Sequence, residues 1–508
     1  MIRVLLAEDE TAIRRGITTL IETVNPLFRV VAAVKNGREA IDYLDKNKVD
    51  VVITDINMPI VSGVELMSYL HQNHPDVFVV VISGYDDFNY ARSAIQYGAE
   101  DYLLKPPEKR ELQAALQKLS DKIVARRYQQ RHQAFSDAMF SPQKGKEESL
   151  ISPTFLLYLC AGPLPAAFHE DFSPGKQFWD EVNLQSLVQS LISREDFAWV
   201  YSARSLAEYA VILSLKDKND IRPVADTLQK KLSGGMPVSI AVSGCIRQLG
   251  DVQEEYIRLR QLLFEESPFL KSGVVYEWES GKSSGAELLD EDCKERIRLA
   301  VKSERFGEFQ READALFQRI RQTGCSQREV KRTLSEVCLM VYDGHRWFES
   351  YTVEDTVSEL ISSAESVSGL REDFLEVCRD VMKKDYFDTK DKGALMASVE
   401  QYILKNLASS ISTKALSQKF GLVAPYLSRL FKDYKGVTPA QYIQNIRLQA
   451  AKKLLIEKPD MLSKEIAEYL GYNNATYFSR AFKKNFGLYP SEYRKEKTGE
   501  TVKNQEDI

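Results

Sequence analysis

The first 105 residues alternate between short apolar runs and segments with helical periodicity. The apolar runs are four to seven residues long and occupy 3–7, 28–34, 51–54, 77–83 and 101–104. Segments with apolar residues every three or four positions lie between them, at 11–23, 37–46, 61–72 and 86–97. This alternation is typical of βαβ units, and the unbroken apolar character of the runs indicates strands buried on both faces. We therefore expect a doubly wound parallel sheet.

Polar residues follow or close four of these strands. Glu8 and Asp9 come after the first run, Asp55 after the third, Ser83 ends the fourth and Lys105 follows the fifth. The carboxyl ends of parallel strands share one edge of the sheet, so these side chains should converge there. Clustered carboxylates repel one another unless a cation offsets them, and Mg²⁺ prefers oxygen ligands. For any single residue, a solvated acidic rim with a structural lysine is the alternative.

The motifs LLAEDE, TDINMP, VISGYDD and DYLLKP stand at these strand ends. With them, residues 1–121 resemble the receiver domain of two-component response regulators. The resemblance implies that Asp55 accepts a phosphoryl group from a sensor histidine kinase. It also implies an Mg²⁺ site at Glu8, Asp9, Asp55 and the backbone of Asn57, and phosphoryl-binding or switch roles for Ser83, Tyr102 and Lys105. The family often has two aspartates where this chain has Glu8 and Asp9.

A phosphohydrolase with an aspartyl nucleophile is the rival interpretation of this pocket. Such enzymes generally carry a second carboxylate two residues after the nucleophile as a general acid, and here that position is Asn57. We therefore expect no enzyme activity beyond autophosphorylation from a donor and slow autodephosphorylation at Asp55.

An internal repeat lies near the carboxyl terminus. SRLFKDYKGVTPAQY at 428–442 matches SRAFKKNFGLYPSEY at 479–493 with a constant offset of 51 residues. Solenoids need at least three stacked repeats, so each copy should be a self-contained unit. Before each copy, a short helix and a glycine lead into a second helix, at 413–420 and 425–434, and again at 463–470 and 474–486. This order predicts two helix-turn-helix units.

The predicted second helices have one apolar and one polar face. The residues expected to pack inward are Leu427, Leu430, Phe431, Phe478, Ala481 and Phe482. Residues 395–497 carry 17 Lys and Arg against 8 Asp and Glu, whereas residues 1–120 carry 13 against 17. A basic domain on an acidic chain favours a polyanion such as nucleic acid as partner, and a solvated basic surface is the alternative.

With this repeat, residues 395–497 resemble the DNA-binding domain of AraC/XylS-type activators, in which a long helix, here 439–456, bridges two helix-turn-helix units. Two recognition helices on such a bridge can enter major-groove faces about 34 Å apart. The resemblance implies base contacts near Pro425, Ser428, Arg429, Asn474, Thr476, Ser479 and Arg480. For phosphate contacts we expect Lys432, Arg447 and Lys483.

The middle of the chain carries weaker signals. A helix should run from Pro106 to about residue 135 with a stripe of Leu112, Leu116, Leu119 and Ile123, which could dimerise or pack on the receiver. Residues 148–283 read as an α/β module that resembles the degenerate cyclase-like domain of large regulators. The cyclase signature is absent, since the nearest candidate, at 234–237, has no acids. We expect no catalysis there, and a helical connector after it.

Both ends together resemble a two-component response regulator of the YesN type. The expected parts are a receiver at 1–121, a helical linker at 122–147, the α/β module at 148–283, a helical connector at 284–390, the DNA-binding domain at 395–497 and a disordered tail at 498–508. No apolar run reaches the ~20 residues of a membrane span, and the six cysteines form no CxxC pair, so we expect a cytoplasmic chain with reduced thiols.

In this phosphorelay interpretation, phosphorylation of Asp55 controls sequence-specific binding to double-stranded promoter DNA and thereby transcription. The expected partners are a sensor histidine kinase, promoter DNA and RNA polymerase, with a homodimer left open. The alternative is a constitutive DNA-binding transcription factor whose receiver serves as a protein-interaction scaffold.

Overall fold

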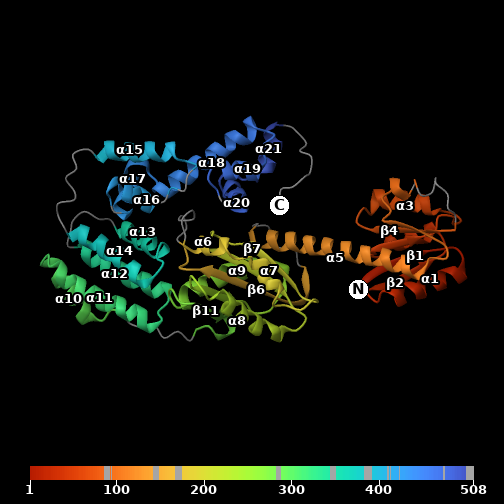
Figure 1. Cartoon of the computed structure of the whole chain (residues 1–508), viewed down its shortest axis with the longest axis horizontal. Helices are drawn as coiled ribbons and strands as arrows, with labels where there is room; N and C mark the ends of the chain where they lie inside the picture. The colour runs from red at the N-terminus through yellow and green to blue at the C-terminus, as the bar shows by residue number, and fades with distance from the viewer. Residues whose placement is uncertain are drawn as a thin grey trace. The chain divides into compact units, whose positions relative to one another are not determined.

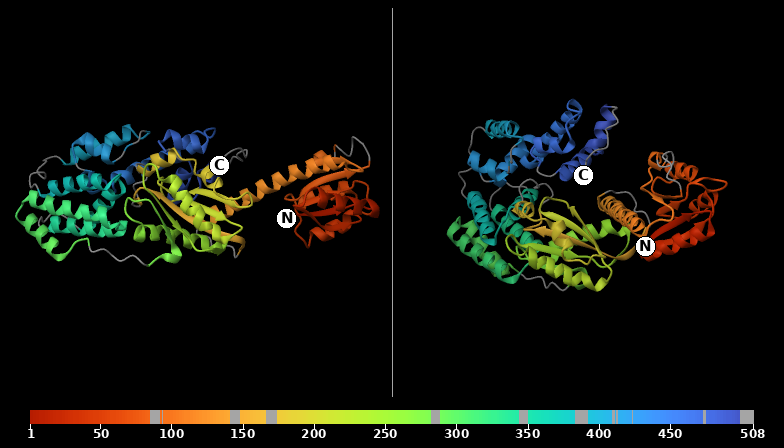
Figure 2. Two further views of the ribbon diagram at one scale, coloured as in Figure 1. Left: turned by 60° about the horizontal axis from the view of Figure 1, so that its bottom comes forward. Right: turned by 45° about the vertical axis from the view of Figure 1, so that its right-hand side comes forward.

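A computed structural model gives the fold of the chain (Figures 1 and 2). It describes residues 1–84, 92, 94–140, 148–165, 174–281, 288–343, 350–382, 392–408, 411, 413–422, 424–472 and 475–498. The chain divides into two compact units, Met1–Ala134 and Phe135–Ile508.

The first unit is built on a five-stranded parallel sheet with the order β2-β1-β3-β4-β5. Its strands are β1 (Ile2–Ala7), β2 (Phe28–Val34), β3 (Val51–Thr54), β4 (Phe78–Ser83) and β5 (Asp101–Leu104). β1 lies beside β3, so the ends of β1, β3, β4 and β5 follow one another along one edge of the sheet. The predicted parallel sheet is confirmed.

Helices cover both faces of this sheet. They are α1 (Thr11–Val24), α2 (Gly37–Leu44), α3 (Gly63–Asn73) and α5 (Lys109–Phe140). One core joins α1 and α5 to the sheet through residues such as Ile21 and Leu116, and the other joins α2 and α3 through residues such as Ile41 and Leu66. This burial on both faces explains why the strands read as continuous apolar runs. Most of the helix expected at 86–97 lies outside the described residues.

The apolar stripe of α5 belongs to the core of the first unit. Leu112, Leu116, Leu119 and Ile123 are all buried there, at 3% exposure or less. Of the two roles left open for this stripe, packing on the receiver is therefore the one that the structure shows.

The second unit begins with a mixed six-stranded sheet, β11-β9-β6-β8-β7 with β10 beside β6. Its strands are β6 (Ser149–Ala161), β7 (Phe197–Ser202), β8 (Glu208–Ser214), β9 (Val238–Val242), β10 (Ile246–Gln248) and β11 (Gly273–Tyr276), and its helices are α6 (Pro174–Asp180), α7 (Leu184–Gln189), α8 (Ile221–Leu232) and α9 (Val252–Glu266). β6 pairs antiparallel with both β8 and β9, whereas β11 runs parallel to β9. The module is thus α/β, and its likeness to a cyclase stays a prediction.

A bundle of helices with its own core follows the mixed sheet. Its helices are α10 (Glu291–Lys302), α11 (Phe306–Thr323), α12 (Gln327–Asp343), α13 (Ser350–Ser362) and α14 (Val367–Met382). Their apolar residues recur at helical spacing, which is why this region was expected to be helical.

The carboxyl-terminal part is all helical. Its helices are α15 (Lys392–Lys405), α16 (Thr413–Phe420), α17 (Ala424–Lys435), α18 (Pro439–Glu457), α19 (Ser463–Tyr469), α20 (Ala475–Phe486) and α21 (Pro490–Thr498). The pairs α16/α17 and α19/α20 each have a separate core. α18 supplies Ile443 to the first core and Leu448, Ala451 and Leu455 to the second. Across the described residues, no helix combines the length and apolarity that a membrane span requires.

Candidate functional sites

The polar residues at the ends of the receiver strands form one pocket. Lys105, just after β5, lies between two carboxylates: its Nζ is 2.7 Å from Oε2 of Glu8 and 2.8 Å from Oδ2 of Asp55. The side chains of Glu8 and Asp55 are only 1% and 8% exposed. The single ammonium therefore offsets part of the negative charge of two buried acids that would otherwise repel each other.

Burial and charge oppose each other in this pocket. Burial raises the pKa of Glu8, although the hydrogen bond and charge of Lys105 act in the other direction. For Lys105, burial alone would lower the pKa, but hydrogen bonds and charges from Asp55 and Glu8 outweigh it and the pKa is raised. The ammonium is therefore retained at neutral pH, ready to bind oxygen anions.

The carboxylates of Glu8, Asp9 and Asp55 form a compact oxygen cluster. One oxygen of each lies within 4.8 Å of the others, and Asp9 is exposed whereas the other two are buried. Such a set is compatible with a hard divalent cation that keeps some of its water on the exposed side.

The remaining predicted receiver residues border the same edge. Ser83 ends β4 and is 1% exposed, Tyr102 lies half-buried on the neighbouring strand β5, and Asn57 lies exposed two residues after Asp55. The structure thus brings the strand-end residues of β1, β3, β4 and β5 to one edge of the sheet.

Two residues that were not predicted hold this pocket in place. A Cβ at Gly63 would lie 2.0 Å from the carbonyl oxygen of Asp55, so only glycine permits this approach. Gly63 also donates its N–H to the carbonyl of Ile56 at 2.8 Å. Arg14 donates to the backbone carbonyls of Glu8 and Asp9, the latter at 3.2 Å, which fixes the turn after β1. The glycine eight residues after the acid was the available sequence signal for Gly63.

The helix-turn-helix units pack as their sequence pattern predicts. All six residues expected to face inward are buried: Leu427, Leu430, Phe431, Phe478, Ala481 and Phe482. Gly421 and Gly471 end the first helices with positive φ angles of 66° and 81°, a conformation that favours glycine.

Four of the predicted DNA-contacting side chains are described on the second helices. Ser428, Lys432, Ser479 and Lys483 are half-exposed, away from the two cores. Lys483 Nζ lies 3.9 Å from the centre of the Tyr489 ring. Ser428 and Lys432 contact carboxylates of α13: Ser428 Oγ donates to Glu359 at 3.2 Å, and Lys432 Nζ lies 3.3 Å from Asp355. Asn474 and the side chains of Pro425, Arg429, Thr476 and Arg480 lie outside the described part of the chain.

The prediction that Arg447 contacts phosphate is wrong. Its side chain is 1% exposed, and its Nε donates to the backbone carbonyl of Leu407 at 3.0 Å. Its guanidinium also lies 5.7 Å from the centre of the Tyr472 ring. Arg447 on α18 therefore connects the segment after α15 with the turn after α19.

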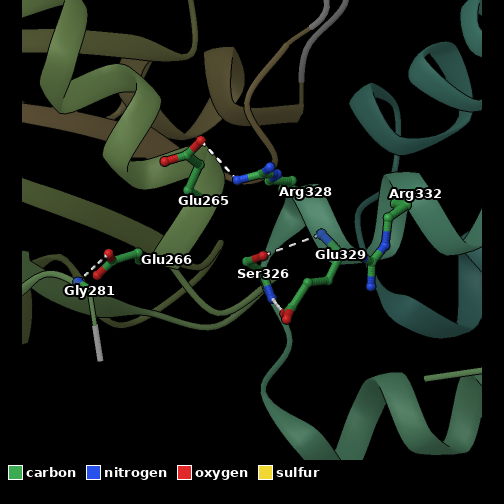
Figure 3. Close-up of a pocket in the computed structure, with 7 residues that line it drawn as sticks. All are labelled: Glu265, Glu266, Gly281, Ser326, Arg328, Glu329 and Arg332. Carbon is green, nitrogen blue, oxygen red and sulfur yellow. Dashed lines mark hydrogen bonds and ion pairs between the residues drawn. The ribbon is translucent and has the colours of Figure 1, made fainter. Parts of the chain in front are cut away.

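A pocket of about 310 Å³ lies between α9 and α12 (Figure 3). Most of its charged side chains are already paired: Arg328 with Glu265 at 3.1 Å, and Glu266 with the Gly281 N–H at 2.8 Å. Ser326 and Glu329 cap the start of α12. These contacts join the mixed sheet to the helical bundle and indicate a structural role.

Comparison with known proteins agrees with the geometry of both sites. Residues 4–117 match the family model of the response regulator receiver domain, and residues 416–496 match a helix-turn-helix domain. The uncharacterized transcriptional regulatory protein YesN of Bacillus subtilis is 34% identical over 119 residues, 23% of this chain and 32% of YesN. The chain therefore combines a response regulator receiver domain with a helix-turn-helix domain.

Two further relatives align with part of this chain. The transcriptional regulatory protein HptR of Staphylococcus aureus is 36% identical over 119 residues, which are 23% of this chain and 46% of HptR. The receiver domain of AraT, a response regulator from Geobacillus stearothermophilus, is 38% identical over 25% of this chain and 97% of that structure, with a TM-score of 0.24. The chain thus spans about half the length of HptR and a third of YesN.

Proposed function

We propose that this chain is a cytoplasmic two-component regulator in which phosphorylation of Asp55 by a sensor histidine kinase controls binding to promoter DNA. The observation that carries the proposal is the position of Lys105, whose ammonium touches both Glu8 and Asp55 at the edge where the acidic cluster gathers.

The pocket contains the groups that phosphoryl transfer needs. A carboxylate oxygen of Asp55 attacks phosphorus, a new O–P bond forms, and the N–P bond of the phosphohistidine breaks so that the imidazole leaves with the electron pair. Glu8, Asp9, Asp55 and the backbone of Asn57 would hold Mg²⁺, which neutralises the charge on the phosphoryl oxygens when bound. Lys105 and the hydroxyl of Ser83 bind these oxygens, and Tyr102 turns inward as Ser83 moves.

In the DNA-binding half, α17 and α20 are the recognition helices. Ser428 and Ser479, with Pro425, Arg429, Asn474, Thr476 and Arg480, lie at the positions of base contacts. Arginine can address guanine and asparagine adenine through paired hydrogen bonds. Lys432 and Lys483 bind phosphates, which orient the protein on DNA without specifying sequence. RNA polymerase is the expected downstream partner, and a homodimer would place two such domains on one promoter.

Intact mass after incubation with Mg²⁺ and acetyl phosphate tests the acceptor. Wild type should gain one phosphate, as should the control Asp42→Ala, which removes an exposed acid of α2. Asp55→Ala should gain none. A phosphate on the Asp55→Ala chain would contradict the assignment of the acceptor.

Promoter DNA then tests the control step. Affinity for a duplex selected from a random library should differ between the phosphorylated and unphosphorylated wild type. Equal affinities would contradict phosphate control and favour a constitutive DNA-binding protein whose receiver is an interaction scaffold.

A further inference from the structure

Two helices of the second unit meet through matched polar side chains. Asp355 and Glu359 on α13 are four residues apart, as are Ser428 and Lys432 on α17. Asp355 faces Lys432 at 3.3 Å, and Glu359 accepts from Ser428 at 3.2 Å. Residues four apart lie one above the other on a helix. The two rows therefore pair in register, with the helices running in opposite directions.

The α17 side of this contact is the surface proposed to read DNA. Leu427, Leu430 and Phe431 fill the core of the first helix-turn-helix unit, so Ser428 and Lys432 lie on the opposite side of the helix. A phosphate or base edge would have to occupy the space that the two carboxylates take. Contact with α13 and contact with DNA through these residues exclude each other.

The α13 side is chemically suited to this role. α13 has three acids, Glu354, Asp355 and Glu359, and no lysine or arginine. Carboxylates accept charge-assisted hydrogen bonds as phosphates do. Glu354 pairs with Lys331 of α12 at 3.2 Å, while Val357 and Ile361 anchor α13 in the core of the helical bundle. Asp355 and Glu359 are thus presented on a fixed support.

We infer that Asp355 and Glu359 form an intrachain docking surface for α17 and that this surface competes with DNA for the first helix-turn-helix unit. The inference rests on the proposed DNA binding and adds a regulatory step to it. A partly exposed ion pair and a hydrogen bond are weak, so DNA displaces them at a modest loss of affinity, about 3- to 10-fold.

Neutralising the docking surface tests the competition. Asp355→Asn/Glu359→Gln should bind about 3- to 10-fold more tightly than wild type to a duplex selected with this variant from a random-sequence library, at fixed salt. The matched control is Glu372→Gln/Glu376→Gln, which removes the same charge from two exposed acids of α14 that make no hydrogen bond or ion pair with the described side chains of α17, and it should stay near wild type. Equal affinities of both double variants would overturn the inference.

A cross-link tests the contact without DNA. Glu359→Cys/Ser428→Cys should form a disulfide on mild oxidation, identified by peptide mass, and the selected duplex should suppress it. Glu354→Cys/Ser428→Cys is the control and should not form it. Failure of the first pair to cross-link would overturn the docking contact. The cross-link could also form although neither wild type nor Asp355→Asn/Glu359→Gln binds any duplex. That result would refute the proposed DNA binding and the competition, while it would establish the contact between α13 and α17.

Discussion

At the scale of single residues, Lys105 and a divalent cation depend on the same carboxylates. The Lys105 ammonium lies within 2.8 Å of both Glu8 and Asp55, so its one positive charge is shared by two of the three acids of the cluster. The negative charge of these acids is therefore offset partly by Lys105 and partly by any cation that binds in the pocket.

Removing this ammonium should strengthen Mg²⁺ binding. In Lys105→Met the cluster loses a competing positive charge, and we expect about 10-fold tighter binding, on the order of 1–2 kcal/mol. Isothermal titration calorimetry on the full chain measures this, with the exposed Lys48→Met as control. Weaker binding by Lys105→Met would show that the ammonium organises the acids rather than competing for them.

The pH dependence of Mg²⁺ binding follows from Glu8. Burial raises the pKa of this carboxyl above its ordinary 4.5, and the ion binds the ionised form. Since a raised carboxyl pKa means protonation at higher pH, affinity should fall earlier on acidification than an ordinary carboxyl would cause. Calorimetry over a pH series should show this fall in wild type and a flatter profile in Glu8→Gln. Profiles of identical shape would refute the role of Glu8.

Gly63 is expected to tolerate no side chain. In Gly63→Ala the new Cβ meets the carbonyl of Asp55 at 2.0 Å, so the backbone must shift at a cost of about 1–3 kcal/mol. Gly16→Ala on α1 is the control, because its Cβ would meet nothing within 4 Å. Hydrogen exchange of the β3 peptide and phosphate uptake from acetyl phosphate should both change in the first variant and not in the second. Unchanged uptake in Gly63→Ala would show that Asp55 does not depend on this approach.

At the scale of elements, α18 organises the DNA-binding domain. It contributes to the cores of both helix-turn-helix units, and its buried Arg447 binds the carbonyl of Leu407. The two lysines still expected to bind phosphates, Lys432 and Lys483, lie on α17 and α20.

Salt dependence distinguishes these two kinds of basic residue. Lys483→Met should reduce the slope of log affinity against log salt by about 0.9, because one phosphate contact is lost. Arg447→Met leaves the partly buried carbonyl of Leu407 without this donor, at a cost of about 1–3 kcal/mol, yet it should leave the slope unchanged. DNA titrations at several salt concentrations, with thermal unfolding of both variants, provide the test. A lower slope for Arg447→Met would restore it as a phosphate contact.

For the apolar stripe of α5, two variants distinguish packing on the receiver from dimerisation. Leu116 is fully buried in the receiver core, so Leu116→Ala should cost about 2–5 kcal/mol of local stability. The exposed Val124→Ala should change stability by less than about 0.5 kcal/mol. Hydrogen exchange of β1 measures the first effect, and light scattering measures mass. Dissociation of an oligomer by Leu116→Ala, with unaltered exchange, would support the dimerising role instead.

At the scale of the whole molecule, the receiver was the most predictable part. Its parallel strands are buried on both faces, so they are continuous apolar runs in the sequence, and topology alone places Glu8, Asp55 and Lys105 at one edge. The buried residues of α17 and α20 were likewise predictable, because their apolar residues recur at helical spacing.

Features that depend on distant partners were not predictable. Arg447 was expected to contact phosphate, because nothing near it in the sequence indicates its actual partner, the carbonyl of Leu407, which lies 40 residues away. The contact of Ser428 with Glu359 spans 69 residues. Periodicity records which face of a helix is apolar, but it does not record what the polar face meets.

The shared helix α18 also constrains how such a regulator can evolve. Because one continuous helix enters both cores, inserting a single residue within it would rotate one helix-turn-helix unit by about 100° and move it about 1.5 Å relative to the other. The two helix-turn-helix units could then no longer contact both parts of their former DNA site at the same time. We therefore expect new DNA targets to arise by exchange of side chains on α17 and α20 rather than by a change in the length of α18.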